Sequence, residues 1–117
     1  IPAGTVVPGI ENVPIAVLID GGTASAAEMF AAGMRVRNRA VLVGETTAGN
    51  TENLVLHNFT DGSRLWLAEY AYRLPGGALI EDTGVQPDRA IAAEWWRFDP
   101  ADDPQVQAAL AALHHGR

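Results

Sequence analysis

Apolar positions in the first half of the chain follow two different spacings. Residues 14–19 and residues 40–44 are continuous apolar runs, which are typical of strands buried on both faces of a sheet. Between them, from Ala26 onwards, apolar residues recur every three or four positions, which is the period of a helix with one apolar face. The order strand, helix, strand predicts a βαβ unit in which the helix crosses one face of two parallel strands.

The expected helix carries different side chains on its two sides. Its apolar side consists of the largest residues of the segment with one glycine, namely Met29, Phe30, Gly33 and Met34. Glu28 and Arg35 fall on the opposite side, which we expect to face away from the sheet.

Alternation of apolar and polar residues marks the next part of the chain. Leu54–Phe59 and Arg64–Tyr72 alternate between two faces, and Asp61-Gly62 between them supplies the left-handed position of a tight turn. These segments predict an antiparallel ribbon. The polar stretch 45–53 before it is too long for a hairpin turn and is the kind of exposed loop that often lines a site.

The last part of the chain predicts one strand and one helix. Arg89–Ala93 follows a turn and is expected to form a short final strand. Asp103 before Pro104 is expected to cap a terminal helix whose apolar positions are Val106, Ala109, Leu110 and Leu113. The aromatic residues before this helix either pack it onto the body, which is the commoner arrangement, or form an exposed recognition patch; they are Trp95, Trp96 and Phe98.

Composition narrows the classes of function. The chain has 117 residues, 48% of them hydrophobic, which fits one packed domain or part of a larger one. The formal net charge is −6 and all eight basic residues are arginines, which are scattered apart from Arg35, Arg37 and Arg39. No basic stripe results, so we expect no nucleic-acid partner. Without cysteine or lysine, the chain itself offers no disulfide, thiolate zinc site, cysteine nucleophile or lysine base.

No targeting, membrane or cofactor motif is found in the sequence. The longest apolar run, Val13 to Ile19, contains Pro14 and is far shorter than the ~20 residues that cross a bilayer. No metal-ligand spacing or phosphate-binding glycine loop occurs, so no cofactor is expected. The compartment stays open between exported and cytoplasmic, because no signal is visible.

The strongest chemical signal is the segment Gly21 to Glu28, where a buried strand ends in glycines and a helix begins near Ser25. Such a turn exposes a hydroxyl, and the following N–H, that of Ala26, can face a developing oxyanion. The same residues also form a capping box, in which Ser25 and Glu28 bond each other's backbone N–H groups. The local pattern by itself favours the capping box.

Candidate bases for such a serine are few. His57 lies in a ribbon strand on the face of Val55 and Phe59, so we expect a packed or half-buried side chain; the other two imidazoles, His114 and His115, fall at a helix end. Glu81 lies in a turn-rich segment, where the local pattern predicts a solvated carboxylate.

Four separated motifs resemble the tail-specific, or C-terminal processing, serine peptidases. They are residues 14–28, 39–49, 61–63 and 84–88, and the resemblance extends from about residue 13 to 113. It implies an α/β fold of the ClpP/crotonase-like spiral type, a βαβ unit followed by an antiparallel ribbon and a C-terminal helix. It also implies that residues 1–117 are the C-terminal part of a catalytic domain, without its N-terminal subdomain or a PDZ domain.

The resemblance assigns roles to particular residues. Ser25 is the expected nucleophile, and the Ala26 N–H is one half of the oxyanion hole, with the other half upstream. Asn50 stands where one branch of the family has a lysine base, so the chain is closer to the tricorn-core and retinoid-binding-protein-like branch. There a histidine upstream is the base, and Glu81 matches the glutamate that supports it. The fragment alone is therefore expected to be inactive.

Three interpretations follow from these features. The first is a serine endopeptidase fragment that acts on a peptide or protein laid alongside the site as an added strand. The second is a noncatalytic binding module of the same fold, which a large apolar pocket would favour. The third is a fragment that forms a homo-oligomer through surface meant for a missing subdomain.

Overall fold

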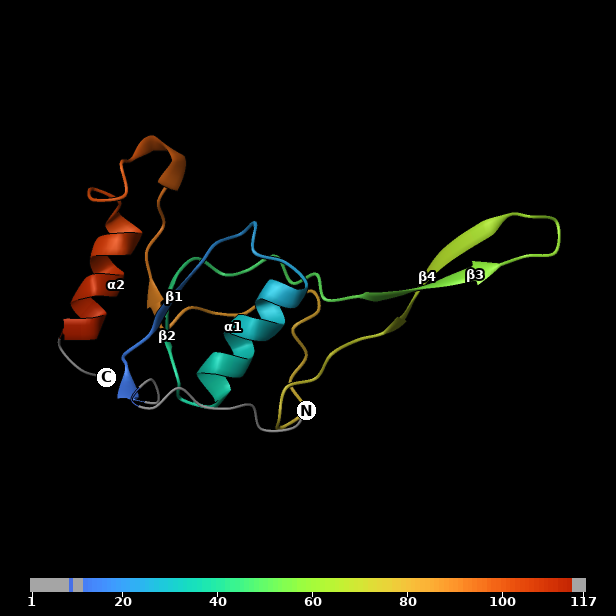
Figure 1. Cartoon of the computed structure of the whole chain (residues 1–117), viewed down its shortest axis with the longest axis horizontal. Helices are drawn as coiled ribbons and strands as arrows, with labels where there is room; N and C mark the ends of the chain where they lie inside the picture. Colours follow the sequence, from blue (N-terminus) through green and yellow to red (C-terminus); the bar gives the residue numbers. More distant parts are fainter. Residues whose placement is uncertain (1–8, 10–11, 115–117) are drawn as a thin grey trace.

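The strands of the main body form a parallel sheet, as the apolar runs predict. The computed structural model describes residue 9 and residues 12–114. In chain order the elements are β1 (Ala16–Ile19), α1 (Ala26–Val36), β2 (Val41–Gly44), β3 (Asn53–Asn58), β4 (Arg64–Tyr70), β5 (Arg89–Ala90), a 3₁₀ turn (Trp95–Arg97) and α2 (Pro104–His114). The sheet order is β1-β2-β5, and both pairings are parallel. The predicted βαβ unit is therefore confirmed, and the strands lie between α1 and α2 (Figure 1).

Helix α1 packs on the sheet through its small residues. Ala31 and Ala32 are buried in the core together with Ile19, Leu42, Ile80 and Val85. Phe30, expected on the packed side, is 59% exposed, and Glu28, expected to face away, is fully buried. That prediction was wrong, because alanines let the helix approach the strands closely and because loop donors satisfy the buried carboxylate.

Strands β3 and β4 form the predicted antiparallel ribbon, which projects away from the rest of the molecule (Figure 1). The chain reverses at residues 59–63, where Gly62 has φ +86° and the Phe59 N–H donates to the Ser63 carbonyl at 3.0 Å. Large apolar side chains on both faces of the ribbon are exposed, among them Leu54, Trp66 and Leu67. The molecule is consequently elongated, with extents of 59 × 39 × 26 Å.

The terminal helix starts as predicted. The Asp103 carboxylate caps α2 by accepting the Gln105 N–H at 2.7 Å and the Val106 N–H at 3.4 Å. The buried residues of α2 are Gln105, Ala109 and Ala112, whereas Leu110 is exposed. Over the described part of the chain, neither helix is both long enough and apolar enough to cross a membrane.

The aromatic residues before α2 do not pack as expected. The rings of Trp95 and Trp96 meet edge to face, with centroids 5.8 Å apart. Both side chains are more than half exposed, and Phe98 is exposed as well. The expectation that these rings fasten the helix to the body was therefore wrong, since the helix is held instead by its alanines against β1 and β2.

Candidate active site

Ser25 occupies a strained turn between β1 and α1. The chain leaves β1 at Ile19 and turns at Asp20, whose carboxylate accepts the Gly22 N–H at 3.0 Å and the Thr23 hydroxyl at 2.9 Å. Ser25 then has φ 56° and ψ −123°, immediately before the first residue of α1. A residue with a side chain pays about 1–3 kcal/mol for such a backbone conformation. The serine is nevertheless exposed. A strained, exposed serine between strand and helix is the arrangement of a nucleophile elbow.

The predicted capping box between Ser25 and Glu28 is present. The Ser25 N–H donates to Glu28 Oε2 at 3.0 Å. The Glu28 N–H also donates to the Ser25 carbonyl oxygen at 3.0 Å. Because a capping serine normally has an extended backbone, capping alone does not account for the φ of 56° at Ser25.

Glu28 ties the start of α1 to the loop between β2 and β3. Besides the Ser25 N–H, its carboxylate accepts the Thr47 hydroxyl, the Gly49 N–H at 2.7 Å and the Asn50 N–H at 2.9 Å. Burial by itself raises the pKa of Glu28, but these four hydrogen bonds outweigh it and lower the pKa below its ordinary value of 4.5. Glu28 is therefore a buried anion at neutral pH.

The same loop is fastened to the serine turn through its backbone. The Ser25 N–H also donates to the Asn50 carbonyl oxygen at 2.8 Å, and the Ala48 N–H donates to the Thr23 carbonyl oxygen at 2.9 Å. On the other side of the loop, the Thr47 hydroxyl accepts a hydrogen bond from the Val85 N–H at 2.7 Å. The loop is thus bonded on both sides, to the serine turn and to the segment around Val85.

Glycines allow this close approach. A Cβ on Gly84 would lie 2.3 Å from the Thr47 carbonyl oxygen, and one on Gly49 would lie 2.8 Å from the Gly84 nitrogen. Both residues also have positive φ, +67° and +71°. Only glycine fits these two positions, because any side chain there overlaps backbone atoms.

Glu81 lies at the far end of this loop. Its Oε2 accepts both the N–H and the hydroxyl of Thr51 at 2.7 Å. Thr51 is 1% exposed and Glu81 is partly buried, so Glu81 is not the freely solvated carboxylate that the local pattern predicts. Ser25 and Glu81 are thus linked through residues 50 and 51, and Ala26 follows Ser25 as the first residue of α1.

The two histidines that the structure describes are not part of this network. His57 lies on the ribbon with its side chain 42% exposed, and its Nε2 is 2.5 Å from Glu69 Oε1. The half-buried position predicted for His57 is therefore found. His114 is exposed at the end of α2, and His115 lies outside the described residues. Within the described ranges, no group of three His, Asp or Glu side chains is placed to hold a metal ion.

The sequence analysis did not predict that three residues, Glu28, Thr47 and Thr51, take part in this network. Glu28 was assigned only to the capping box, and Thr47 and Thr51 were part of an unspecified polar loop. One feature of the sequence could have indicated them. A loop rich in threonine and glycine follows directly after a buried strand, and the backbone N–H groups of such a loop need acceptors when they are buried.

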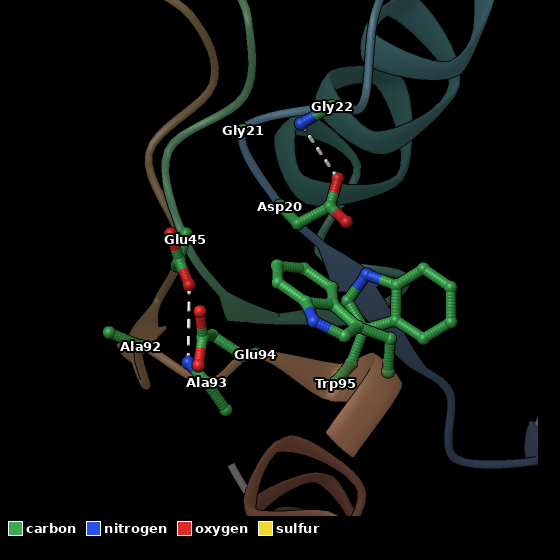
Figure 2. Close-up of a pocket in the computed structure, with 9 residues that line it drawn as sticks. Asp20, Gly21, Gly22, Glu45, Ala92, Ala93, Glu94 and Trp95 are labelled. Atoms are coloured by element: carbon green, nitrogen blue, oxygen red, sulfur yellow. Dashed lines mark hydrogen bonds between the residues drawn. The ribbon is translucent and has the colours of Figure 1, made fainter. Parts of the chain in front are cut away.

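A separate cavity of about 450 Å³ lies where β1 and β2 end (Figure 2). Glu45 closes one side by accepting the Ala93 N–H at 3.1 Å, and Asp20 lies on another side. Its lining combines three carboxylates with two indole rings; the residues are Asp20, Gly21, Gly22, Glu45, Ala92, Ala93, Glu94, Trp95 and Trp96. The wall therefore combines carboxylates with apolar and aromatic side chains.

Comparison with known proteins places the chain in a family. The profile described as peptidase family S41 matches residues 7–91, which include the serine turn, the loop and Glu81. The chain belongs to peptidase family S41. The fold agrees with solved protease structures, since a photosystem II D1 C-terminal processing protease and the tricorn protease both match the chain.

Individual relatives are peptidases. The chain is 34% identical over 106 residues to the carboxyl-terminal-processing protease of Synechocystis sp., a match that covers 88% of this chain and 25% of the relative. It is 32% identical over 83 residues to a probable CtpA-like serine protease of Staphylococcus haemolyticus, covering 71% of the chain and 17% of that protein. The crystal structure of the tricorn protease matches with a TM-score of 0.69 and 25% identity over 86% of this chain and 10% of that chain. The chain thus spans a quarter or less of these relatives.

Proposed function

We propose that this chain is the nucleophile-bearing part of a serine endopeptidase and that Ser25 forms the acyl-enzyme. The observation that carries the proposal is the exposed Ser25 at φ 56°, held between β1 and the N-terminus of α1. Backbone strain of this kind persists only where the surroundings enforce it, and here Glu28 and the Asn50 carbonyl both bind the Ser25 N–H. Membership of the S41 family supports the same reaction class.

The reaction proceeds by acyl transfer. Ser25 Oγ attacks the carbonyl carbon of the scissile peptide bond while its proton passes to a general base. The resulting oxyanion is stabilised by the Ala26 N–H, which is the first of α1 and has no partner within the helix, and by the positive end of the helix. The protonated base then gives its proton to the departing amine, and water hydrolyses the acyl-enzyme.

The general base is proposed to come from outside these 117 residues. Glu28 is excluded as the base, because its carboxylate is buried and already accepts four hydrogen bonds. The Asn50 carboxamide cannot accept a proton at neutral pH. A histidine from an N-terminal subdomain, oriented by Glu81, would complete the site. Residues 1–117 are then the C-terminal part of a catalytic domain and are inactive alone.

The competing proposal is a noncatalytic module that binds an apolar ligand. Such a ligand needs a predominantly aliphatic or aromatic pocket. The cavity beside β1 and β2 is instead bordered by Asp20, Glu45 and Glu94, which would be costly to desolvate against an apolar molecule. The indole rings of Trp95 and Trp96 would accept such a ligand, so the strained Ser25 turn, rather than this cavity, supports the peptidase.

Cleavage of a quenched fluorescent peptide by the intact protein tests the proposal. Ser25→Ala is expected to lower kcat by at least about 10⁴-fold with KM little changed, because the nucleophile is lost. Ser63→Ala, at the exposed ribbon turn, is the matched control and should keep full activity. Equal activity of the Ser25→Ala variant and the wild type would overturn the proposal.

A further inference from the structure

We propose that the cavity beyond β1 and β2 binds the guanidinium group of an arginine side chain in a peptide. The inference goes beyond the proposed reaction at Ser25, because it assigns a ligand to a cavity that the reaction does not use. It follows from three features of the cavity, which are its place in the fold, its carboxylates without a cation and its exposed indole rings.

The cavity lies at the edge of the sheet where the parallel strands end. Asp20, Gly21 and Gly22 directly follow β1, and Glu45 directly follows β2, whereas residues 92–96 after β5 supply the rest of the lining. In open α/β sheets, ligands bind in crevices outside the carboxyl ends of the strands. The volume of about 450 Å³ also falls within the roughly 300–1,000 Å³ that is typical of ligand sites. Both the position and the size of the cavity therefore suit a ligand.

Two of the three carboxylates that line the cavity have no cationic partner. Glu94 is paired with Arg97, but over the described part of the chain neither Asp20 nor Glu45 forms an ion pair. Both side chains are partly buried, and their hydrogen bonds come from neutral donors. Solvent screens such charges less than charges on an open surface, so they attract a cation into the cavity.

The free oxygens of these carboxylates point to an organic cation as the ligand. Asp20 accepts its hydrogen bonds on Oδ1 and Glu45 accepts its one on Oε1. Among the hydrogen bonds of the described residues, none uses Asp20 Oδ2 or Glu45 Oε2, so one oxygen of each remains for a donor. No group of three His, Asp or Glu side chains in the described ranges is placed to hold a metal ion, which excludes a metal held by the described residues alone.

The indole rings give the cavity a second means of holding a cation. Trp95 and Trp96 are 52% and 64% exposed, so much of their ring surface is free of contact with the body. The face of an indole ring carries negative charge density and attracts a cation placed over it. Figure 2 shows Asp20, Glu45 and Trp95 bordering the same space. A single ligand group can therefore meet a carboxylate and an indole ring together.

A guanidinium group matches these walls better than an ammonium group does. Its planar face stacks on an aromatic ring while the N–H groups at its edge donate to carboxylate oxygens. An ammonium group has no such plane and is more strongly hydrated. The carbon stem of an arginine side chain can also pack on the small apolar residues of the lining, Ala92 and Ala93. The expected ligand is therefore arginine rather than lysine.

Isothermal titration calorimetry on the intact protein tests the assignment. The Ser25→Ala variant is used throughout, so no peptide is cleaved and the result does not depend on whether Ser25 is catalytic. The probes are blocked tripeptides with arginine, lysine or citrulline between two glycines, citrulline being the uncharged isostere of arginine. The arginine peptide is expected to bind at least about tenfold more tightly than the citrulline peptide and at least about threefold more tightly than the lysine peptide. Added salt should weaken its binding.

Two substitutions locate the binding site. Glu45→Gln removes a charge but keeps an oxygen that can accept the Ala93 N–H, and Trp95→Leu removes one ring. Each is expected to weaken binding of the arginine peptide at least about fivefold. Glu52→Gln and Trp66→Leu, exposed residues that do not line the cavity, are the matched controls and should leave its affinity unchanged. The proposal would be overturned by a folded protein that does not bind the arginine peptide, by equal affinity for arginine and citrulline, or by unchanged affinity in Glu45→Gln.

Discussion

At the scale of single residues, the turn that contains Ser25 depends on one buried carboxylate. Glu28 accepts N–H groups from Ser25, Gly49 and Asn50 and the hydroxyl of Thr47. The donors come from two segments that would otherwise have to satisfy their buried N–H groups separately. Glu28 therefore holds the backbone of Ser25 in place through a hydrogen bond.

Replacing Glu28 with Gln tests this role. The amide presents an NH₂ to donors that need an acceptor, so the free energy of unfolding should fall by about 2–3 kcal/mol. Urea denaturation of the isolated chain measures the loss. Glu52→Gln, an exposed acid in the same loop, should change it by less than about 0.5 kcal/mol. Equal stability of Glu28→Gln and wild type would contradict the role of the carboxylate.

The lowered pKa of Glu28 also predicts how stability depends on pH. Because the folded-state pKa lies below the ordinary value of 4.5, the unfolded chain binds the proton more readily. The contribution of Glu28 is thus complete above the ordinary pKa and is lost as pH falls through the folded-state pKa. Urea denaturation between about pH 3 and pH 7 should show this decline in wild type and a smaller one in Glu28→Gln. Parallel curves for the two proteins would count against it.

At the scale of elements, the loop and the turn after Ile80 fit together because they contain glycine at the contact. Gly84 has φ +67° and brings the chain against the Thr47 carbonyl. The ribbon of β3 and β4 leaves the body directly after the loop and does not contribute to this contact (Figure 1).

Gly84→Ala should disrupt this contact more than a positive φ alone can explain. The reference is Gly76→Ala, since Gly76 has φ +95° but an added Cβ there would meet nothing within 4 Å. Gly76→Ala is expected to cost about 1–2 kcal/mol for the left-handed backbone. Gly84→Ala should cost at least about 1 kcal/mol more, because its Cβ overlaps a carbonyl oxygen. Similar losses in thermal unfolding would show that the close approach is unimportant.

At the scale of the whole molecule, much of the fold was predictable and much of the site was not. The strands, α1, the ribbon and the Asp103 cap follow from periods of two or 3.6 residues and from local capping, which a short window of sequence contains. The role of Glu28 was not predictable in this way, because its other partners lie 19 to 22 residues further along the chain. The capping box also explained Glu28 fully from local sequence, so there was no reason to expect further partners for its carboxylate.

The faces of the helices show a similar limit. The largest residues were expected to be buried, yet Phe30 is exposed and Ala31 and Ala32 form the contact. Residue size predicts burial only when the rest of the surface is known, and the exposed rings of Trp95 and Trp96 make the same point. The role of Ser25 came from resemblance, whereas its strained backbone is visible only in the structure.

The exposed apolar side chains of the ribbon predict self-association of the isolated chain. Leu65, Trp66 and Leu67 are each close to half exposed or more, and an unpaired two-stranded ribbon is only marginally stable in water. Sedimentation velocity should therefore show a larger species growing with concentration. Leu65→Lys/Leu67→Lys on one face of the ribbon should reduce it. A monomer at all concentrations would contradict the prediction.

The most direct test of the central claim is to find which serine reacts. The chain contains two, Ser25 and Ser63, so a fluorophosphonate probe applied to the intact protein can be located by peptide mass spectrometry. Of these two, we predict a label on Ser25 alone, abolished in Ser25→Ala and retained in Ser63→Ala. A folded, intact protein that takes no label on Ser25 would contradict the claim and leave that residue as a structural turn at the start of α1.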